Sequence, residues 1–189
     1  MGIRKRLRIL VIAVLPLVAG LGVEVAASTP AFALGQGSAC MFNAPNAAAG
    51  FGHVGWAFEV GSSGQWVFGS TDDNAAGDPY VPPGQYNGAW SRSGSFSAGL
   101  AAFRASSIGY TRYRCVSTPT SAVGAAVQQA NAAPGWGYTL IGNNCLDHTY
   151  RILTTYRGGI MSPPSLTIIP DDAFVGGLSH DGWGPIISL

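Results

Sequence analysis

A near-neutral charge and a scarcity of charged residues set the first limits on this chain. Of its 189 residues only 10% are charged, and the formal net charge is +1. Beyond its N-terminal segment the sequence holds no cluster of basic residues that could neutralise phosphates, which argues against nucleic-acid binding.

Residues 1–33 have the layout of a secretory signal peptide. Arg4, Lys5, Arg6 and Arg8 form a basic start, an apolar run of 13 residues follows, and Ala31-Phe32-Ala33 is a small-x-small cleavage site. A membrane span needs about 20 apolar residues, and Pro16 interrupts the run. An uncleaved anchor is the alternative, but the sequence favours export of residues 34–189.

The exported part, residues 34–189, is expected to be one domain. Four of the ten basic residues and one of the nine acidic residues precede it, which leaves six arginines, no lysine and eight acidic residues. A chain of this length can bury one sizeable core. It contains no second apolar run long enough to span a bilayer, so we expect a secreted, extracellular protein without a membrane span.

Two aromatic and β-branched runs, 51–60 and 64–70, predict strands joined by a short Gly-Ser turn, and thus a β-hairpin. Residues 71–100 show neither the helical nor the strand periodicity of apolar residues and contain three prolines, which predicts a long irregular loop. Tyr80, Tyr86 and Trp90 in this loop could stack on a sugar or cover a cleft, but a role in the core is the favoured alternative.

Later elements are predicted from caps and periodicity. Residues 108–117 favour a strand, and 118–133 a helix capped by Thr118 and ended by Pro134-Gly135. A second helix is predicted from Asn143 or Asn144 to a left-handed cap at Gly158 or Gly159. The tail should contain a short helical turn at 170–172 and a final edge strand at 184–189.

The chain has three cysteines, Cys40, Cys115 and Cys145. In an oxidising compartment cysteines tend to pair, and an odd number leaves at least one thiol free or paired with another chain. A disulfide between Cys40 and Cys115 would tie the N-terminal segment to the 108–117 strand. The alternative is that both are buried free thiols.

Cys145 falls in the first turn of the second predicted helix, where free N–H groups and aligned peptide dipoles stabilise a thiolate. A thiol hydrolase also needs an imidazole that takes and returns a proton. His53 begins an apolar strand and is the preferred partner, because the glycines at 52 and 55 leave room for another element to come close. His148 follows Cys145 along the same helix, and His180 lies in a turn-rich tail.

Two short motifs resemble the NlpC/P60 papain-like superfamily. The run "GHVGWAFEV…GQWVFGS" is similar to its histidine-bearing hairpin, and "YTLIGNNCLDHTYRIL" to its cysteine-bearing helix. The histidine precedes the cysteine here, which resembles the circularly permuted branch with the lecithin:retinol acyltransferase-like proteins. The match covers residues 51–70 and 138–156 well and the rest loosely.

The resemblance implies a permuted papain-like (NlpC/P60) fold of the α+β class, with a small antiparallel sheet packed against helices. It implies Cys145 as nucleophile and His53 as general base and acid, acting on amide or ester bonds, with cell-wall peptides as a candidate substrate. The family's third polar residue orients the imidazole. Here the best-aligned position holds Phe68, so Ser70, and less directly Gln65, are the candidates.

Two alternatives to the hydrolase remain open at this stage. The chain could be a secreted, non-catalytic binding or interaction module in which Cys145 is buried or bridged to another chain. A metal site is disfavoured, because the histidines and acids show no ligand spacing, and residues 72–78 lack the closing Glu of a calcium loop. No cofactor is expected.

Overall fold

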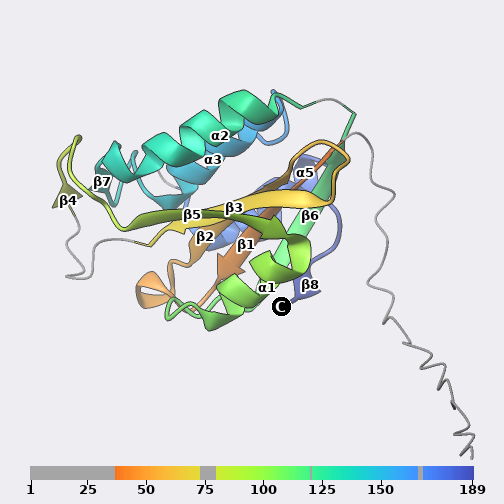
Figure 1. Ribbon diagram of the computed structural model, residues 1–189. Coiled ribbons are helices and arrows are strands. Elements are labelled where there is room, and N and C mark those ends of the chain that lie inside the picture. The colour runs from red at the N-terminus through yellow and green to blue at the C-terminus, as the bar shows by residue number, and fades with distance from the viewer. Residues whose placement is uncertain (1–36, 73–79, 120, 166–167) are drawn as a thin grey trace, which may run out of the picture. The chain divides into compact units, whose positions relative to one another are not determined.

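The structure is a mixed α+β arrangement in which helices cover both faces of an antiparallel sheet (Figure 1). The computed structural model describes residues 37–72, 80–119, 121–165 and 168–189. The predicted signal peptide, 1–33, lies outside the described residues. Within the described ranges, no helix combines the length and the apolar character needed to cross a bilayer.

The main sheet has the strand order β5-β3-β2-β1-β6-β8, and each neighbouring pair is antiparallel. Its strands are β1 (Gly37–Ala44), β2 (His53–Glu59), β3 (Gln65–Thr71), β5 (Ala89–Ser95), β6 (Arg112–Thr118) and β8 (Ile187–Ser188). A second, two-stranded sheet pairs β4 (Tyr80–Val81) with β7 (Tyr138–Thr139).

The helices divide between the two faces of the main sheet (Figure 1). On one face lie α2 (Val123–Ala132), η2 (Ala133–Gly135), α3 (Cys145–Tyr156), and the C-terminal segment of α4 (Pro170–Asp172), η3 (Ala173–Gly177) and α5 (Leu178–His180). The other face carries α1 (Phe96–Ala105), and η1 (Ala48–Gly50) lies between β1 and β2.

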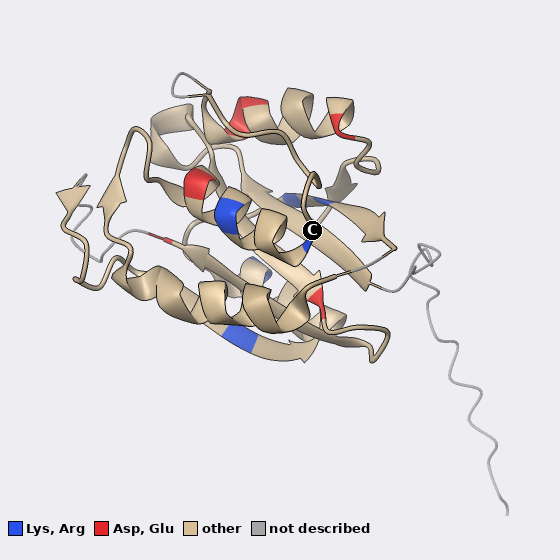
Figure 2. Cartoon of the chain, turned by 90° about the horizontal axis from the view of Figure 1, so that it is seen from above, with Lys and Arg blue, Asp and Glu red and all other residues tan. Residues whose placement is uncertain are grey.

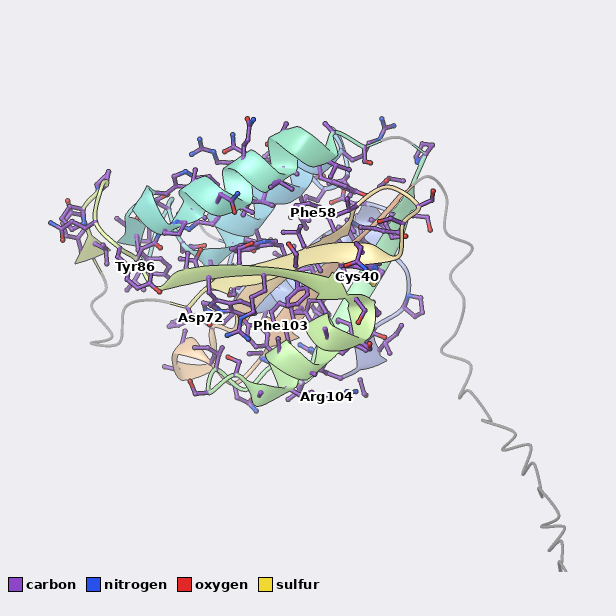
Figure 3. All side chains as sticks on the ribbon, viewed as in Figure 1. Cys40, Phe58, Asp72, Tyr86, Phe103 and Arg104 are labelled. Carbon is purple, nitrogen blue, oxygen red and sulfur yellow. A yellow bond between two sulfur atoms is a disulfide. The ribbon has the colours of Figure 1, made fainter. Side chains whose placement is uncertain are left out.

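Side chains that alternate along the strands build a separate core on each face. Met41 and Phe58 pack with the α2 and α3 side, whereas Phe42 and Ala57 pack with α1. Figure 3 shows Phe58 on the side of α2 and α3, and Phe103 on the side of α1. The sheet is therefore buried on both faces, which explains why β1 has no exposed residue.

The predicted β2–β3 hairpin is present. The amide of Val60 donates to the carbonyl of Gln65, and the Ser63 hydroxyl donates to the carbonyl of Val60. Gly61 and Gly64 adopt φ values of 59° and 72°, which glycine reaches without steric cost. The predictions of a strand in β6, a helical turn at Pro170–Asp172 and a final edge strand at β8 are also confirmed.

Three predicted boundaries or elements are wrong. Part of the expected irregular loop 71–100 forms β4, β5 and the first half of α1; residues 73–79 lie outside the described residues. β5 is an edge strand held by backbone pairing with β3, so it lacks a clear apolar alternation. Its last residue, Ser95, caps α1 by accepting the amide of Ala98.

The other two errors concern helix ends. Thr118 does not cap a helix, because its backbone pairs with Gly37 in the sheet, and α2 begins only at Val123. The Cys145 helix is not capped by a left-handed glycine: its C-cap is Arg157, which has an extended conformation. Gly159, with φ of 70°, follows two residues later. β1 was not predicted, since its sequence is dominated by small residues.

Cys40 and Cys115 form a disulfide. They are direct partners in the β1–β6 ladder and lie 75 positions apart along the chain. The bond joins neighbouring central strands beneath α1, so it constrains the unfolded chain far more than it constrains the sheet.

The double variant Cys40→Ala/Cys115→Ala should therefore unfold more easily, by about 2–5 kcal/mol, while the reactivity of Cys145 in the folded state is retained. Urea unfolding followed by circular dichroism measures the difference. A free energy of unfolding within about 0.5 kcal/mol of wild type would contradict this account of the bond.

Candidate active site

Cys145 is the first residue of α3, and the cap in front of it is formed by Asn144. The Asn144 side-chain oxygen accepts the amides of Leu146 at 2.8 Å and Asp147 at 3.3 Å, and the Asp147 carboxylate accepts the amide of Asn144 at 3.0 Å. This capping box fixes the helix start. It places the sulfur at the positive end of the helix dipole, where the dipole stabilises a thiolate.

His53, the first residue of β2, is brought to this helix start. Its side chain lies close enough to Cys145 for the charge of the sulfur and a hydrogen bond to it to raise the pKa of the imidazole. On the other side of the ring, Nε2 lies 3.1 Å from the Ser70 hydroxyl and 3.3 Å from the Asp72 carboxylate. Because Nε2 faces these two groups, Nδ1 is the ring nitrogen available to the sulfur.

Asp72 is a member of the site that sequence reasoning missed. In the β2–β3 register Gly55 pairs with Ser70, and two residues further along each strand stand His53 and Asp72. The predicted strand ends at Ser70, so only Phe68, Ser70 and Gln65 are considered for the residue that orients the imidazole. Counting the hairpin register from its turn would have placed an acid opposite His53.

Besides His53, two groups bond the carboxylate of Asp72, and a third bonds one of these two. Trp90 Nε1 donates to Oδ2 at 2.5 Å, and the Tyr110 hydroxyl donates to Oδ1 at 3.1 Å. The Ser70 hydroxyl lies 2.5 Å from that of Tyr110. Figure 3 labels Asp72 at the end of the sheet near the start of β5. The acid cannot turn away from the imidazole without breaking these bonds.

The electrostatics match an ion pair. Burial lowers the pKa of His53, but Cys145 and Asp72 outweigh burial and raise that pKa to about 10. Burial raises the pKa of Asp72, yet the hydrogen bond and charge of His53 lower it below its usual value overall. Burial and the Asp72 charge raise the pKa of Tyr110 well above its usual value, so Tyr110 stays neutral and donates.

The remaining predicted residues lie elsewhere. Phe68 packs in the core against α1, and Gln65 is at the opposite end of β3 from Asp72. His148 is buried on α3 but bonds Thr71 and Asn143 rather than the thiol. His180 is exposed at the end of α5.

A cavity of about 510 Å³ opens beside Cys145. Its apolar lining comes from the loop after β1, the segment before α3 and the segment before α4. Its main apolar residues are Phe51, Leu140, Ile141, Leu146, Ile168 and Ile169. Phe51, Leu140 and Ile141 remain 58%, 61% and 70% exposed. Large apolar side chains that stay this exposed beside the Cys145 thiol point to a ligand surface.

Charged residues are few and scattered over the described chain in Figure 2. Among the described residues that line the cavity, the one acid, Asp147, is already engaged in the helix cap. These residues therefore offer no strong charge to bind an ionic group. Tyr80 and Tyr86, at 56% and 65% exposed, do not line it, and Trp90 is committed to Asp72.

Comparisons of the chain with protein-family models, with curated proteins and with solved structures find no match.

Alkylation of Cys145 by iodoacetamide tests the ion pair. Since the pKa of His53 is raised from 6.5 to about 10, its imidazolium persists through neutral pH beside the sulfur, where a positive charge favours the nucleophilic form of a thiol. Wild type should therefore react well below pH 8, and His53→Ala should need a higher pH for the same rate. Mass spectrometry after timed quenching gives the rates. Because Cys145 is the one free cysteine, the label reports on it alone.

The exposed His180→Ala serves as the matched control and should keep the wild-type profile. A profile that is unchanged in His53→Ala, or a wild-type thiol that reacts only after denaturation, would contradict the pair.

Proposed function

We propose that the chain is a secreted thiol hydrolase that cleaves an amide or ester bond through Cys145 and His53. One observation carries the proposal: the His53 ring contacts the thiol on one side and Ser70 and Asp72 on the other. A nucleophile, a base and a group that orients the base are the parts that such catalysis requires. The order of the two motifs and their resemblance to the permuted NlpC/P60 branch support the same class.

The chemistry follows from the positions of the groups. The Cys145 thiolate attacks the carbonyl carbon and forms a C–S bond, and His53 gives its proton to the departing amine or alcohol. Water then attacks the acyl-enzyme while His53 accepts its proton; the C–S bond breaks, and the acid product leaves. Asp72 keeps the ring oriented and stabilises the imidazolium throughout.

The helix start also determines which amide can stabilise the oxyanion. The cap already takes the amides of Leu146 and Asp147. The amide of Cys145 is then the first-turn donor that can face a negatively charged tetrahedral intermediate. A donor at the nucleophile's own backbone nitrogen is well placed, since the attacked carbonyl lies against the sulfur.

The acyl side of the substrate should be uncharged and apolar, because the described lining of the cavity beside Cys145 is mainly apolar and its one acid is bonded in the helix cap. Cell-wall peptides remain a candidate substrate because the two motifs resemble the NlpC/P60 superfamily, provided that an apolar portion of the peptide enters the cavity. Secretion is supported by the signal-like N-terminal sequence and by the Cys40–Cys115 disulfide.

A non-catalytic binding module is the second candidate. The Cys145 side chain is only 2% exposed, and the apolar cavity could hold a ligand without reacting with it. The two candidates differ in whether bound substrate acylates the sulfur.

Turnover of p-nitrophenyl esters and of peptide amides separates them. Cys145→Ala should abolish turnover, and Asp72→Asn should lower it about a hundredfold, because the imidazolium loses its charge partner. Asp172→Asn, at an exposed acid outside the site, should leave the rate unchanged. Intact-mass spectrometry should show an acyl adduct on wild type. Equal turnover in wild type and Cys145→Ala would end the enzyme proposal.

The apolar cavity predicts a preference for longer acyl chains. From acetyl to hexanoyl esters, kcat/KM should rise up to about fourfold for each methylene, since burying one CH₂ is worth about 0.8 kcal/mol. Ile141→Asp, in the cavity wall, should flatten this series. Ile186→Asp, at an exposed residue outside the cavity, is the matched control. A flat series in wild type would contradict an acyl role for the cavity.

A further inference from the structure

His148 is a buried polar residue that the proposed chemistry does not use. It lies on α3 one turn after Cys145 and is 2% exposed, yet both ring nitrogens have partners. Nδ1 lies 3.0 Å from the Thr71 hydroxyl, and Nε2 lies 2.9 Å from the side-chain oxygen of Asn143.

The hydrogen-bond pattern fixes the tautomer of this ring. The Asn143 amide nitrogen donates to the carbonyl of Trp136 at 3.0 Å, so its side-chain oxygen is an acceptor. Nε2 of His148 must then carry a hydrogen. Burial and the nearby Arg151 charge lower the pKa of His148 to about 4, so the ring is neutral at physiological pH and Nδ1 accepts from the Thr71 hydroxyl.

The two partners of His148 each adjoin a part of the proposed catalytic site. Thr71 is fully buried and stands in β3 between Ser70 and Asp72. Asn143 directly precedes Asn144, the residue that caps the Cys145 helix. One imidazole therefore bridges the strand that leads to the acid and the loop that leads to the nucleophile.

We propose that His148 is a positioning residue that sets the separation between Cys145 and the His53–Asp72 pair by bonding Thr71 and Asn143 at once. The inference rests on the proposed function of the Cys145 site. Packing alone defines this separation less closely: the rings of Trp136 and Tyr138 lie T-shaped to the imidazole, with centroids 5.1 and 6.3 Å away, and such ring contacts are less directional than hydrogen bonds. Two directed bonds fix how α3 is rotated and how far it slides along β3.

Substitutions that remove one bond at a time test the proposal. Thr71→Val keeps the shape of the side chain but removes the hydroxyl that donates to Nδ1, and His148→Gln retains a donor only near the Nε2 position. His148→Asn retains an acceptor near the Nδ1 position. Thr71→Ser restores the hydroxyl and serves as the rescue variant.

The bond from His148 to Thr71 should affect catalysis more than the bond to Asn143. Thr71→Val and His148→Gln should lower kcat by about tenfold or more at unchanged KM, because a displacement of about 1 Å suffices to misalign the reacting groups. The alkylation rate of Cys145 at pH 6 should fall together with kcat in these two variants. Thr71→Ser and His148→Asn should lie closer to wild type. Thr155→Val, which removes a hydroxyl bonded to the helix's own Arg151 carbonyl, should change neither readout.

The outcomes separate positioning from simple stabilisation. If Thr71→Val and His148→Gln lower only the urea midpoint, while kcat and the alkylation profile of the folded protein stay at wild-type values, the proposal is overturned. Should wild type show no turnover on any ester or amide, the proposed function fails, and the alkylation profile still decides whether His148 sets the geometry of the thiol.

Discussion

The contact between the Cys145 sulfur and the His53 imidazole is the interaction on which the rest of the site depends. Neither group is stable in its charged form alone, because a buried thiolate needs a positive neighbour and a buried imidazolium needs a negative one. The sulfur is placed by the start of α3 and the ring by the start of β2. Asp72, held by Trp90 and Tyr110, keeps the ring charged and oriented.

The fold supports this contact by fixing the two elements independently. The capping box of Asn144 and Asp147 fixes the helix end, and the β2–β3 register fixes the strand end. The β1–β6 disulfide ties together central strands of the same sheet. The proposed link between them is His148, a neutral ring bonded to both sides. The apolar cavity then opens where the helix start, the β1–β2 connection and the segment before α4 meet, so a substrate would enter beside the sulfur.

Local signals in the sequence account for most of what could be predicted. The Gly-Ser turn and its flanking aromatic runs identify the hairpin, and the Asn-Asn-Cys sequence identifies the capped helix, so Cys145 and His53 could be selected as candidates. β1 could not be found in this way, because its small residues carry little strand propensity and Gly37 is dictated by the Tyr156 ring packed against it. β5 depends on pairing with β3, and the roles of Asp72 and His148 depend on contacts across the sheet. Asp72 was within reach of a register count, whereas the bond from His148 to Thr71 joins residues 77 positions apart.

The protonation state of His53 tests the central claim most directly. Imidazole nitrogen chemical shifts, followed by nuclear magnetic resonance from pH 5 to pH 9 in wild type and in Cys145→Ala, report it without any substrate. We expect both ring nitrogens of wild-type His53 to remain protonated across this range, in keeping with a pKa raised to about 10, and the ring to lose its proton at lower pH once the sulfur is removed. Titration of wild-type His53 near pH 6.5, with the same curve in Cys145→Ala, would contradict the account.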